Sequence, residues 1–325
     1  MDVSVVPVQD PRVTSASVGR HQRAPSVGSG FRRRRRGDGR AAVGFLAPTL
    51  LGFLAFTLLP TIASFVLSLF NYSLVASTSF TGLENYIHLF ADPVFRSSLY
   101  NTLYFVIAYT VVCMLLALGT TLWVSSKHIM AKGIYRVLFF IPVVTPIVAN
   151  ALIWSLLFSP NNGIATWLGD HVIPGFSSNP LGSPTLAMPV VIIMSIWQGF
   201  GYNMLILTAG LESIPQDYFE AARIDGAGRW RTLISVKLPL LSPVLFFTIT
   251  LTLINSFQVF TQPYVLTGGG PGDATTTMVL YMYERGFEAY QMGYASAIAW
   301  ILFLIILVLT VLQFRVRRRW VFYES

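Results

Sequence analysis

Polar residues divide this chain into long apolar stretches. A helix of about 20 apolar residues crosses the roughly 30 Å hydrocarbon core of a bilayer. The apolar runs are continuous rather than alternating, which favours helices over a β-barrel. Six intervals contain no Lys, Arg, Asp or Glu, and they lie between Arg40 and Glu84, Arg96 and Lys127, Arg136 and Asp170, Asp170 and Glu212, Lys237 and Asp273, and Glu288 and Arg315. We therefore predict an all-α polytopic membrane protein with six transmembrane helices, at about residues 43–70, 99–124, 135–158, 187–211, 238–262 and 292–314.

The composition agrees with a membrane protein. Of the 325 residues, 54% are hydrophobic and only 11% are charged, and the mean hydropathy is +0.62. The single cysteine, Cys113, lies within the second predicted span and has no second cysteine for an internal disulfide. We interpret it as a small packing residue rather than a reactive thiol.

The first 40 residues form a polar tail that ends in the arginine run 32–36. Such a run can bind nucleic acid, but its position just before an apolar span favours a cytoplasmic flank held inside by its charge. The tail's composition predicts disorder. The apolar region that follows is too long for a cleaved signal peptide, and no small-residue cleavage site is evident.

The basic residues also set the orientation of the spans. With the N-terminus inside, six crossings place 20 Lys and Arg residues in cytoplasmic segments and only Arg96 and Arg285 outside. The acidic residues divide into eight inside and six outside, which gives net charges of +12 and −4 and the total of +8. Because cytoplasmic loops carry an excess of Lys and Arg, both termini are expected in the cytoplasm. Residues 212–237 then form a cytoplasmic loop, and residues 321–325 form a short tail.

The longest polar interruption after Arg40 runs from Glu220 to Pro239 and reads EAARIDGAGRWRTLISVKLP. Alanines favour a helix at its start, and Gly226 can take the left-handed conformation that ends one. We predict a short helix, a glycine turn and a second short helix. Glu220 is expected near the start of the first helix, where its charge suits the helix dipole. On composition alone, a solvated linker between two membrane helices is the favoured interpretation, since short charged linkers are common.

Three sequence motifs lead to a more specific interpretation of this loop and of the chain around it. The spacing from Glu220 to Pro239 resembles the EAA loop of ABC importer permeases, E-A-A-x3-G-x9-I-x-L-P, with Val236 in place of isoleucine. The segment 80–86 (FTGLENY) and the segment 266–271 (LTGGGP) resemble external segments of sugar-type permeases, although an interfacial aromatic segment and a simple turn would look similar. On these motifs, residues 41–320 are identified as a member of the maltose/glycerol-3-phosphate permease-like family of carbohydrate importers.

The resemblance implies an ABC type I importer permease fold in a bacterial cytoplasmic membrane. It implies four kinds of partner: a second homologous permease, an ABC ATPase dimer, an extracytoplasmic solute-binding protein and the lipid bilayer, with no nucleic acid. The ATPase would dock on Glu220, Ala221, Ala222, Asp225 and Gly226, and the solute-binding protein would contact Gly268, Gly269, Gly270 and Pro271.

The chain lacks the motifs of an enzyme. It has no GxxxxGK[ST] phosphate loop, so ATP and Mg²⁺ are expected only on the partner ATPase, with no cofactor on this chain. No nucleophile elbow or HExxH occurs, and the four histidines are scattered, so neither a catalytic site nor a metal site is predicted.

The interiors of the predicted spans lack ionisable residues, which argues against a proton-driven symporter. A sodium-coupled or facilitative secondary transporter of a neutral solute remains the alternative, because carbonyls and hydroxyls can bind sodium. Uncharged polar groups suit a sugar, although they also pack helices together. By resemblance to maltose permeases, Tyr202 takes the place of a substrate-facing tyrosine, and Ser256 that of a sugar-contacting asparagine. The predicted pathway residues are Gln198, Gly199, Tyr202, Asn255, Ser256 and Gln258.

Overall fold

The computed structural model describes residues 35–73, 78–126, 129–160, 163–172, 178–317 and 321–322. The chain divides into two units, residues 1–59 and residues 60–325. In the first unit the described chain is helical, with α1 (Arg35–Phe53) followed by the π-helical stretch η1 (Leu54–Leu58). Residues 1–34 of the predicted N-terminal tail and residues 323–325 of the C-terminal tail lie outside the described residues.

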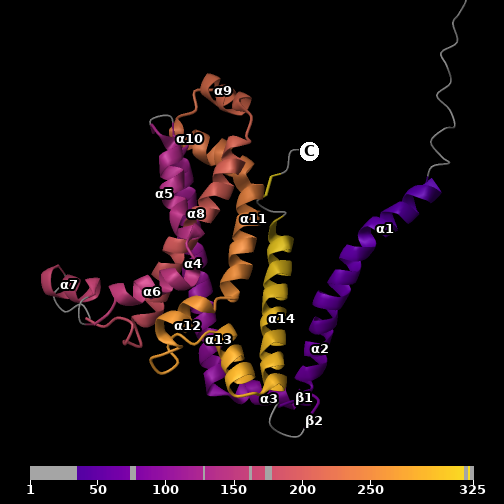
Figure 1. Ribbon diagram of the computed structural model, residues 1–325. Coiled ribbons are helices and arrows are strands. Elements are labelled where there is room, and N and C mark those ends of the chain that lie inside the picture. The colour runs from indigo at the N-terminus through magenta and orange to yellow at the C-terminus, as the bar shows by residue number, and fades with distance from the viewer. Residues whose placement is uncertain are drawn as a thin grey trace, which may run out of the picture. The chain divides into compact units, whose positions relative to one another are not determined.

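The second unit consists of helices and one short antiparallel hairpin, in which Phe70 pairs with Phe80. In Figure 1, α9 and α10 lie at one end of this unit, and α3, α12, α13 and the hairpin lie at the other. The elements are α2 (Leu59–Ser68), β1 (Phe70–Asn71), β2 (Ser79–Phe80), α3 (Glu84–Ala91), α4 (Pro93–Val124), α5 (Lys132–Val144), α6 (Ile147–Leu157), α7 (Ile164–His171), α8 (Ala187–Glu212), α9 (Gln216–Ile224), α10 (Arg229–Thr232), η2 (Leu233–Lys237), α11 (Leu238–Phe257), α12 (Thr261–Thr267), α13 (Met278–Tyr283), η3 (Glu284–Glu288) and α14 (Met292–Val316).

Five helical stretches of the described chain are long and apolar enough to cross a membrane. A sixth crossing results if α5 and α6, which bend by 93° at the break between them, form one span. The fold is therefore that of a helical membrane protein with five or six crossings. The five stretches are Val43–Ser68, Pro93–Val124, Ala187–Glu212, Arg229–Phe257 and Met292–Val316.

The third predicted span is not one straight helix, and this corrects the expectation for residues 135–158. The chain leaves the helical conformation at Thr145, which is extended, and Pro146 then precedes the first turn of α6. A residue before proline is pushed away from the α conformation, which explains the break. Asn150 in α6 donates from Nδ2 to the carbonyl oxygen of Pro142 at 3.2 Å, so a polar group freed near the bend is satisfied. Pro146 thus caps the start of α6, whereas Pro142 lies inside α5 and does not end it.

Helix α4 lies at the centre of the second unit and contacts α8, α11, α13, α5 and α3. It begins with a strong cap, because Asp92 accepts hydrogen bonds from the backbone N–H of Val94 at 2.9 Å and of Phe95 at 3.4 Å. Pro93 follows at the first helical position, where its missing N–H costs nothing. Cys113 is completely buried in this helix, as expected for a packing residue.

Glycines let the backbones of neighbouring helices approach α8 closely. A Cβ atom at Gly201 would lie 2.0 Å from the carbonyl oxygen of Phe139 in α5. A Cβ at Gly199 would lie 2.2 Å from the hydroxyl oxygen of Tyr109 in α4. Small residues at helix contacts are typical of membrane helices, which gain stability by close packing rather than by burial from water. These contacts fix α8, which leads directly into the loop that contains α9.

Candidate coupling loop and translocation pathway

The loop between the two long helices α8 and α11 is a built structure rather than a flexible linker. Its first turn is held to the core by Ile214, which is buried against Leu211 and Leu241. Phe219 in α9 packs on the same cluster, and the Lys237 ammonium lies 6.0 Å from its ring. The loop therefore presents α9 in a fixed orientation at the end of the second unit (Figure 1).

Gly226 ends α9 in a Schellman motif. The N–H of Ala227 donates to the carbonyl of Ala222 at 2.9 Å, and the N–H of Gly226 donates to that of Arg223 at 3.0 Å. Gly226 has φ +71, a left-handed conformation that glycine adopts without the penalty of a Cβ. The predicted helix, glycine turn and second helix are all present, with Asp225 as the last residue before the turn.

The position of Glu220 differs from the prediction. Because α9 begins at Gln216, Glu220 lies in the middle of the helix, and Asp217 is the acidic residue of the first turn. Glu220 and Ala221 are exposed, whereas Ala222 is buried against the rest of the loop. The helix dipole therefore acts on Asp217 rather than Glu220, and the Glu220 carboxylate is open to a partner.

The loop carries apolar side chains on its surface. Ile224 at the end of α9 is 87% exposed, and Trp230 in α10 is 77% exposed. Large apolar side chains exposed together on a loop that projects from a membrane domain are typical of a protein contact. The exposed Asp225 follows Ile224 directly in sequence, so a carboxylate and an apolar side chain are exposed side by side at the end of α9.

An ion pair lies at the base of the loop. Arg136, in the first turns of α5, contacts Glu212, the last residue of α8, through Nη2 and Oε1. The Arg136 Nε is buried and has no hydrogen-bond partner within the described part of the chain. The pair joins the loop to α5, whose other end is the bend at Thr145.

Two of the predicted pathway residues are on the accessible side of α8. The Tyr202 side chain is 50% exposed, and Gln198 is partly buried one turn before it. Gln198 donates from Nε2 to the carbonyl of Thr145 at 3.4 Å, while its Oε1 is buried without a partner among the described residues. Gly199, the third predicted pathway residue of α8, faces the Tyr109 hydroxyl of α4, which occupies the space beside it. Through its hydrogen bond to Thr145, Gln198 contacts the bend between α5 and α6.

The predicted pathway residues of α11 have unequal environments. Ser256 is only 3% exposed; its Oγ donates to the carbonyl of Leu253 at 2.8 Å and lies 3.5 Å from the Oγ1 of Thr110 in α4. Asn255 and Gln258 are exposed. Ser256 thus packs α11 against α4, and the two amides are the groups of this segment that a solute could reach.

A buried polar cluster joins α4, α8 and α11. The Nδ2 of Asn203 donates to the Sγ of Cys113 at 3.3 Å, and its Oδ1 accepts from the Oγ1 of Thr252 at 3.3 Å. Asn203 is buried, so these bonds satisfy an amide that would otherwise be costly in an apolar environment. This residue holds helices together and has no surface open to a solute in the isolated chain.

The glycine-rich segment between α12 and α13 is anchored on α4. Asn101 donates from Nδ2 to the carbonyl oxygens of Asp273 at 2.7 Å and Thr276 at 3.0 Å. Of the predicted contact residues, Gly268 is exposed, Gly270 and Pro271 are partly buried and Gly269 is buried. A Cβ at Gly269 would lie 2.5 Å from the Thr276 hydroxyl. Gly269 therefore determines the shape of the loop. The exposed residues of the loop are Gly268, Gly272 and Asp273.

A second cluster at this end joins the start of α4 to α13 and α14. The Asp92 carboxylate accepts from the hydroxyls of Tyr281 and of Tyr294, the latter at 2.8 Å. Arg285 donates from Nε to the Tyr281 hydroxyl at 2.8 Å. Burial by itself would raise the pKa of Asp92, but the donated hydrogen bonds outweigh it and lower that pKa. Burial and the bond to Asp92 raise the pKa of Tyr281 to about 12.

The sequence matches the family model described as "binding-protein-dependent transport system inner membrane component" over residues 117–321, which is more than half of the 325 residues. The chain belongs to this family. Its relatives include the probable ABC transporter permease protein YesP of Bacillus subtilis, 38% identical over 89% of this chain and 94% of the relative. The arabinooligosaccharides transport system permease protein AraP of the same species is 32% identical over 83% and 86%.

A third relative, the sn-glycerol-3-phosphate transport system permease protein UgpA of Yersinia pestis, is 36% identical over 76% of this chain and 83% of its own length. The chain is thus a permease subunit of an ABC importer, as the EAA motif predicted. This membership favours ATP-driven import over the sodium-coupled or facilitative transport that the uncharged spans left open.

Solved structures show the same fold. A bacterial ABC transporter for import of the acidic polysaccharide alginate superposes with a TM-score of 0.75 and 21% identity, over 87% of this permease and 96% of the matched chain. The alginate transporter in complex with its pentasaccharide-bound periplasmic protein gives a TM-score of 0.73 at 22% identity, over 87% and 96%. The type I importer permease fold predicted from the motifs is therefore confirmed.

Several residues of the site carried no signal that single-sequence reasoning could use. Arg136 and Glu212 are 76 residues apart, and nothing in the sequence pairs them. Asn101 looks like any uncharged residue of a span, and its partners are backbone carbonyls. Asp92 was detectable, because Asp before Pro is a helix-start signal, but its tyrosine partners were not.

Proposed function

We propose that this permease forms half of the translocation pathway for a sugar or sugar-like solute, in an importer driven by a separate ABC ATPase dimer. A second homologous permease would supply the other half. The observation that carries the proposal is the loop around α9, which packs on the ends of α8 and α11 through Ile214 and Phe219 and exposes α9. Such a loop can transmit a displacement to the two helices that hold most of the predicted pathway residues.

The proposed docking surface for the ATPase combines charge and apolar area. Glu220, Ala221, Asp225 and the apolar Ile224 are exposed on α9 and its end, while Ala222 and Gly226 fix the helix in place. A fitted protein contact commonly has an apolar centre with charged residues around it. ATP and Mg²⁺ would be bound by the ATPase alone. ATP-driven closure of that dimer would move α9 and shift the permease between inward-open and outward-open states.

The proposed solute is uncharged. Among the predicted pathway residues, the accessible polar groups are the amide of Gln198 and the phenol of Tyr202 on α8, and the amides of Asn255 and Gln258 at the end of α11. Neutral hydrogen-bond partners suit hydroxyl-rich solutes, whereas an anionic solute would call for Arg or Lys in the pathway. Relatives named for arabinooligosaccharides and for trehalose and maltose support a sugar, and the glycerol-3-phosphate relatives fit these spans less well.

The solute-binding protein is proposed to dock at the opposite end of the permease, where the anchored tip of the glycine-rich segment is exposed. Gly268, Gly270 and Pro271 remain candidate contacts, with Gly269 acting through the loop's shape. In this arrangement both termini and α9 lie in the cytoplasm, consistent with the distribution of basic residues.

The test is reconstitution of the assembled importer in proteoliposomes with ATP inside and the solute-binding protein outside. A thermal-shift screen of that binding protein identifies the sugar to be used as labelled solute. The proposal expects uptake that needs both ATP and the binding protein. Uptake that needs neither and follows a sodium gradient would contradict it and support the secondary transporter.

A further inference from the structure

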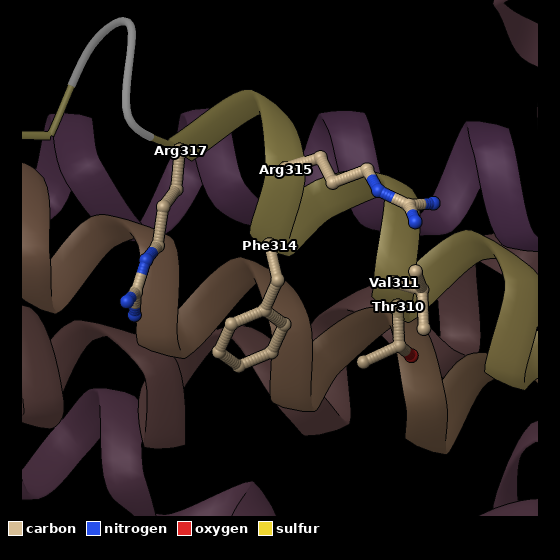
Figure 2. A pocket seen from close by; sticks show the side chains of 5 residues that line it. All are labelled: Thr310, Val311, Phe314, Arg315 and Arg317. Carbon is tan, nitrogen blue, oxygen red and sulfur yellow. The ribbon is translucent and has the colours of Figure 1, made fainter.

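A groove of about 490 Å³ at the C-terminal end of α14 does not gather its charged side chains at one place. Figure 2 shows Arg315 and Arg317 extending to opposite sides of Phe314. At the other end of the second unit, by contrast, aromatic and polar side chains lie together outside the predicted pathway. Four rings, which we call the aromatic row, contact one another there: Phe260, Tyr264, Tyr283 and Phe287.

The aromatic row joins α12 to α13 and η3. Phe260, which caps α12, and Tyr264 within that helix stack with their centroids 5.1 Å apart. Tyr283, the last residue of α13, meets these two rings at 5.2 and 5.5 Å, and Phe287 of η3 stacks on Tyr283 at 5.5 Å. Tyr264 is 41% exposed and Phe287 is 61% exposed. Rings that served only to pack the two helices together would be covered, so the exposed rings indicate a ligand.

Polar groups lie beside these rings. The Tyr264 hydroxyl raises the pKa of the neighbouring Tyr283 hydroxyl, and the Glu288 carboxylate raises it further, so the three groups are close to one another. Glu288 is exposed and takes part in none of the ion pairs found among the described residues. The aromatic row therefore offers an open ring face together with two hydroxyls and a carboxylate. An aromatic belt at a bilayer interface needs no such cluster, since each ring there contacts headgroups.

The aromatic row leads toward the predicted pathway. Phe260 follows Gln258, an accessible pathway residue, by two residues, and α12 packs on α8, which carries Gln198. Figure 1 shows α12 and α13 at the end opposite α9. The row lies between the spans Arg229–Phe257 and Met292–Val316. In the proposed orientation it is on the outer side of the membrane, where the solute arrives.

We propose that the aromatic row is an external binding site for an uncharged sugar, which it receives before the sugar enters the pathway; this inference rests on the proposed function. One face of a sugar ring consists of C–H groups and packs on an aromatic ring, here the open face of Phe287, whereas the sugar hydroxyls need hydrogen-bond partners beside that ring. The two tyrosine hydroxyls and Glu288 supply them, and a carboxylate accepts strong hydrogen bonds from hydroxyl groups. The charge of Glu288 repels an anionic solute such as a sugar phosphate.

The experiment is uptake by the reconstituted importer of the sugar that most stabilises the binding protein, in a thermal-shift screen that includes trehalose, maltose and arabinotriose. Phe287→Leu and Glu288→Gln should each lower the maximal uptake rate at saturating binding protein about tenfold, because each removes one contact with the sugar. Phe287→Tyr keeps a ring and should transport at nearly the normal rate. Phe90→Leu and Glu84→Gln change an exposed ring and an exposed carboxylate of α3 and are the matched controls, with no change expected.

A second measurement separates sugar binding from docking of the solute-binding protein. The concentration of binding protein that half-stimulates ATP hydrolysis should be the same in Phe287→Leu and Glu288→Gln as in the unaltered importer. A shift in that concentration would show that the row contacts the binding protein instead. That result, normal uptake in both variants, or equal losses in Phe287→Leu and Phe287→Tyr would each overturn the external site and leave the proposed function intact. Absence of ATP-dependent sugar uptake by the unaltered importer would overturn the proposed function, and this inference with it.

Discussion

Gly226 shows how one backbone conformation can determine the shape of the proposed docking surface. Its φ of +71 turns the chain, so that α9 ends at Ile224 and α10 begins five residues later at Arg229. A Cβ at this position would meet no atom within 4 Å, so the requirement for glycine comes from the backbone alone. A non-glycine residue in the left-handed region costs about 1–2 kcal/mol, and a β-branched residue more.

Gly226→Val should therefore abolish ATP-driven uptake while the spans stay folded, because α9 can no longer be presented in its present orientation. Gly228 is the matched control: it is two residues away, has an ordinary φ of −67 and has equal space around it. Gly228→Ala should transport at the normal rate. The measurement is uptake, with co-purification of the ATPase as a second readout; normal uptake by Gly226→Val would refute the coupling role of the loop.

The structure assigns different roles to three predicted pathway residues, Tyr202, Gln198 and Ser256, which the sequence alone does not distinguish. Tyr202→Ala and Gln198→Ala should each weaken apparent affinity for the solute roughly tenfold to hundredfold, the consequence of losing one partner worth about 1–3 kcal/mol. Ser256→Ala should instead lower stability by about 0.5–1.5 kcal/mol, because its hydroxyl bonds Leu253 and faces Thr110.

Concentration-dependent uptake and thermal unfolding of the three purified variants distinguish these outcomes. If Tyr202→Ala and Gln198→Ala leave the concentration dependence unchanged, α8 does not line the pathway. If Ser256→Ala changes affinity without changing stability, the serine contacts the solute after all. Single-residue roles of this kind depend on burial in three dimensions, which the order of residues along a helix does not contain.

Among the elements, α5 is the one whose role the sequence predicted least well. Hydrophobicity located the third apolar segment, and a residue before proline, here Thr145, is a signal for a helix boundary. The size of the bend, 93°, and the hydrogen bond from Gln198 of α8 to Thr145 involve contacts between segments far apart in the chain, which the sequence does not contain. By contrast, the helix–turn–helix of the coupling loop followed from local rules for alanine and glycine, although Glu220 lies in the middle of α9 rather than near its start.

The Arg136–Glu212 pair suggests that α5 moves with the coupling loop. Reversing one charge, as in Arg136→Glu or Glu212→Arg, should lower the amount of solute transported per ATP hydrolysed, because like charges then separate α5 from the base of the loop. The exchange Arg136→Glu with Glu212→Arg should restore much of that ratio. A double exchange no better than the single variants would show that the pair has no part in coupling.

The Asp92 cluster makes a prediction about acid stability. Its lowered pKa means that the folded protein favours the carboxylate, so this stabilisation is present above the ordinary value of 3.8 and is lost as the pH falls below it. Asp92→Asn should lower stability at neutral pH and flatten the pH dependence of unfolding below pH 3.8. Thermal unfolding at several pH values, with Glu84→Gln as a control carboxylate, tests this. An unchanged pH profile in Asp92→Asn would contradict it.

For the whole molecule, the distribution of charges along the sequence predicts which end of the second unit faces the cytoplasm. The fold by itself does not test this prediction. The structure places α9 and α10 at the end opposite α12 and α13 (Figure 1). The two ends must therefore differ in accessibility from outside the cell. The family match fixes the architecture, whereas orientation follows from the 20 basic residues predicted on one side and two on the other.

The structure also improves the choice of positions for testing orientation. Gly272 and Ala131 are obvious positions for a cysteine, but both have left-handed backbone conformations, with φ values of +56 and +55. A cysteine at Gly272 would be strained, and Ala131 is strained already. Asn162 lies outside the described residues. Met130, next to Ala131, and Phe287 in η3, which lies between the same two predicted spans as Gly272, are exposed large side chains, and Gly228 has an ordinary φ. Cysteines at these three positions can be introduced in a Cys113→Ala background without forcing the backbone.

An impermeant maleimide applied to intact cells should label Phe287→Cys and leave Met130→Cys and Gly228→Cys unlabelled, while permeabilised cells should label all three. The reason is electrostatic, since moving 20 basic residues to the outside would oppose the charge bias that sets the orientation of membrane helices. Cys113→Ala without an added cysteine controls for background. Labelling of Gly228→Cys from outside intact cells would place the coupling loop beyond the reach of a cytoplasmic ATPase and would end the proposed mechanism.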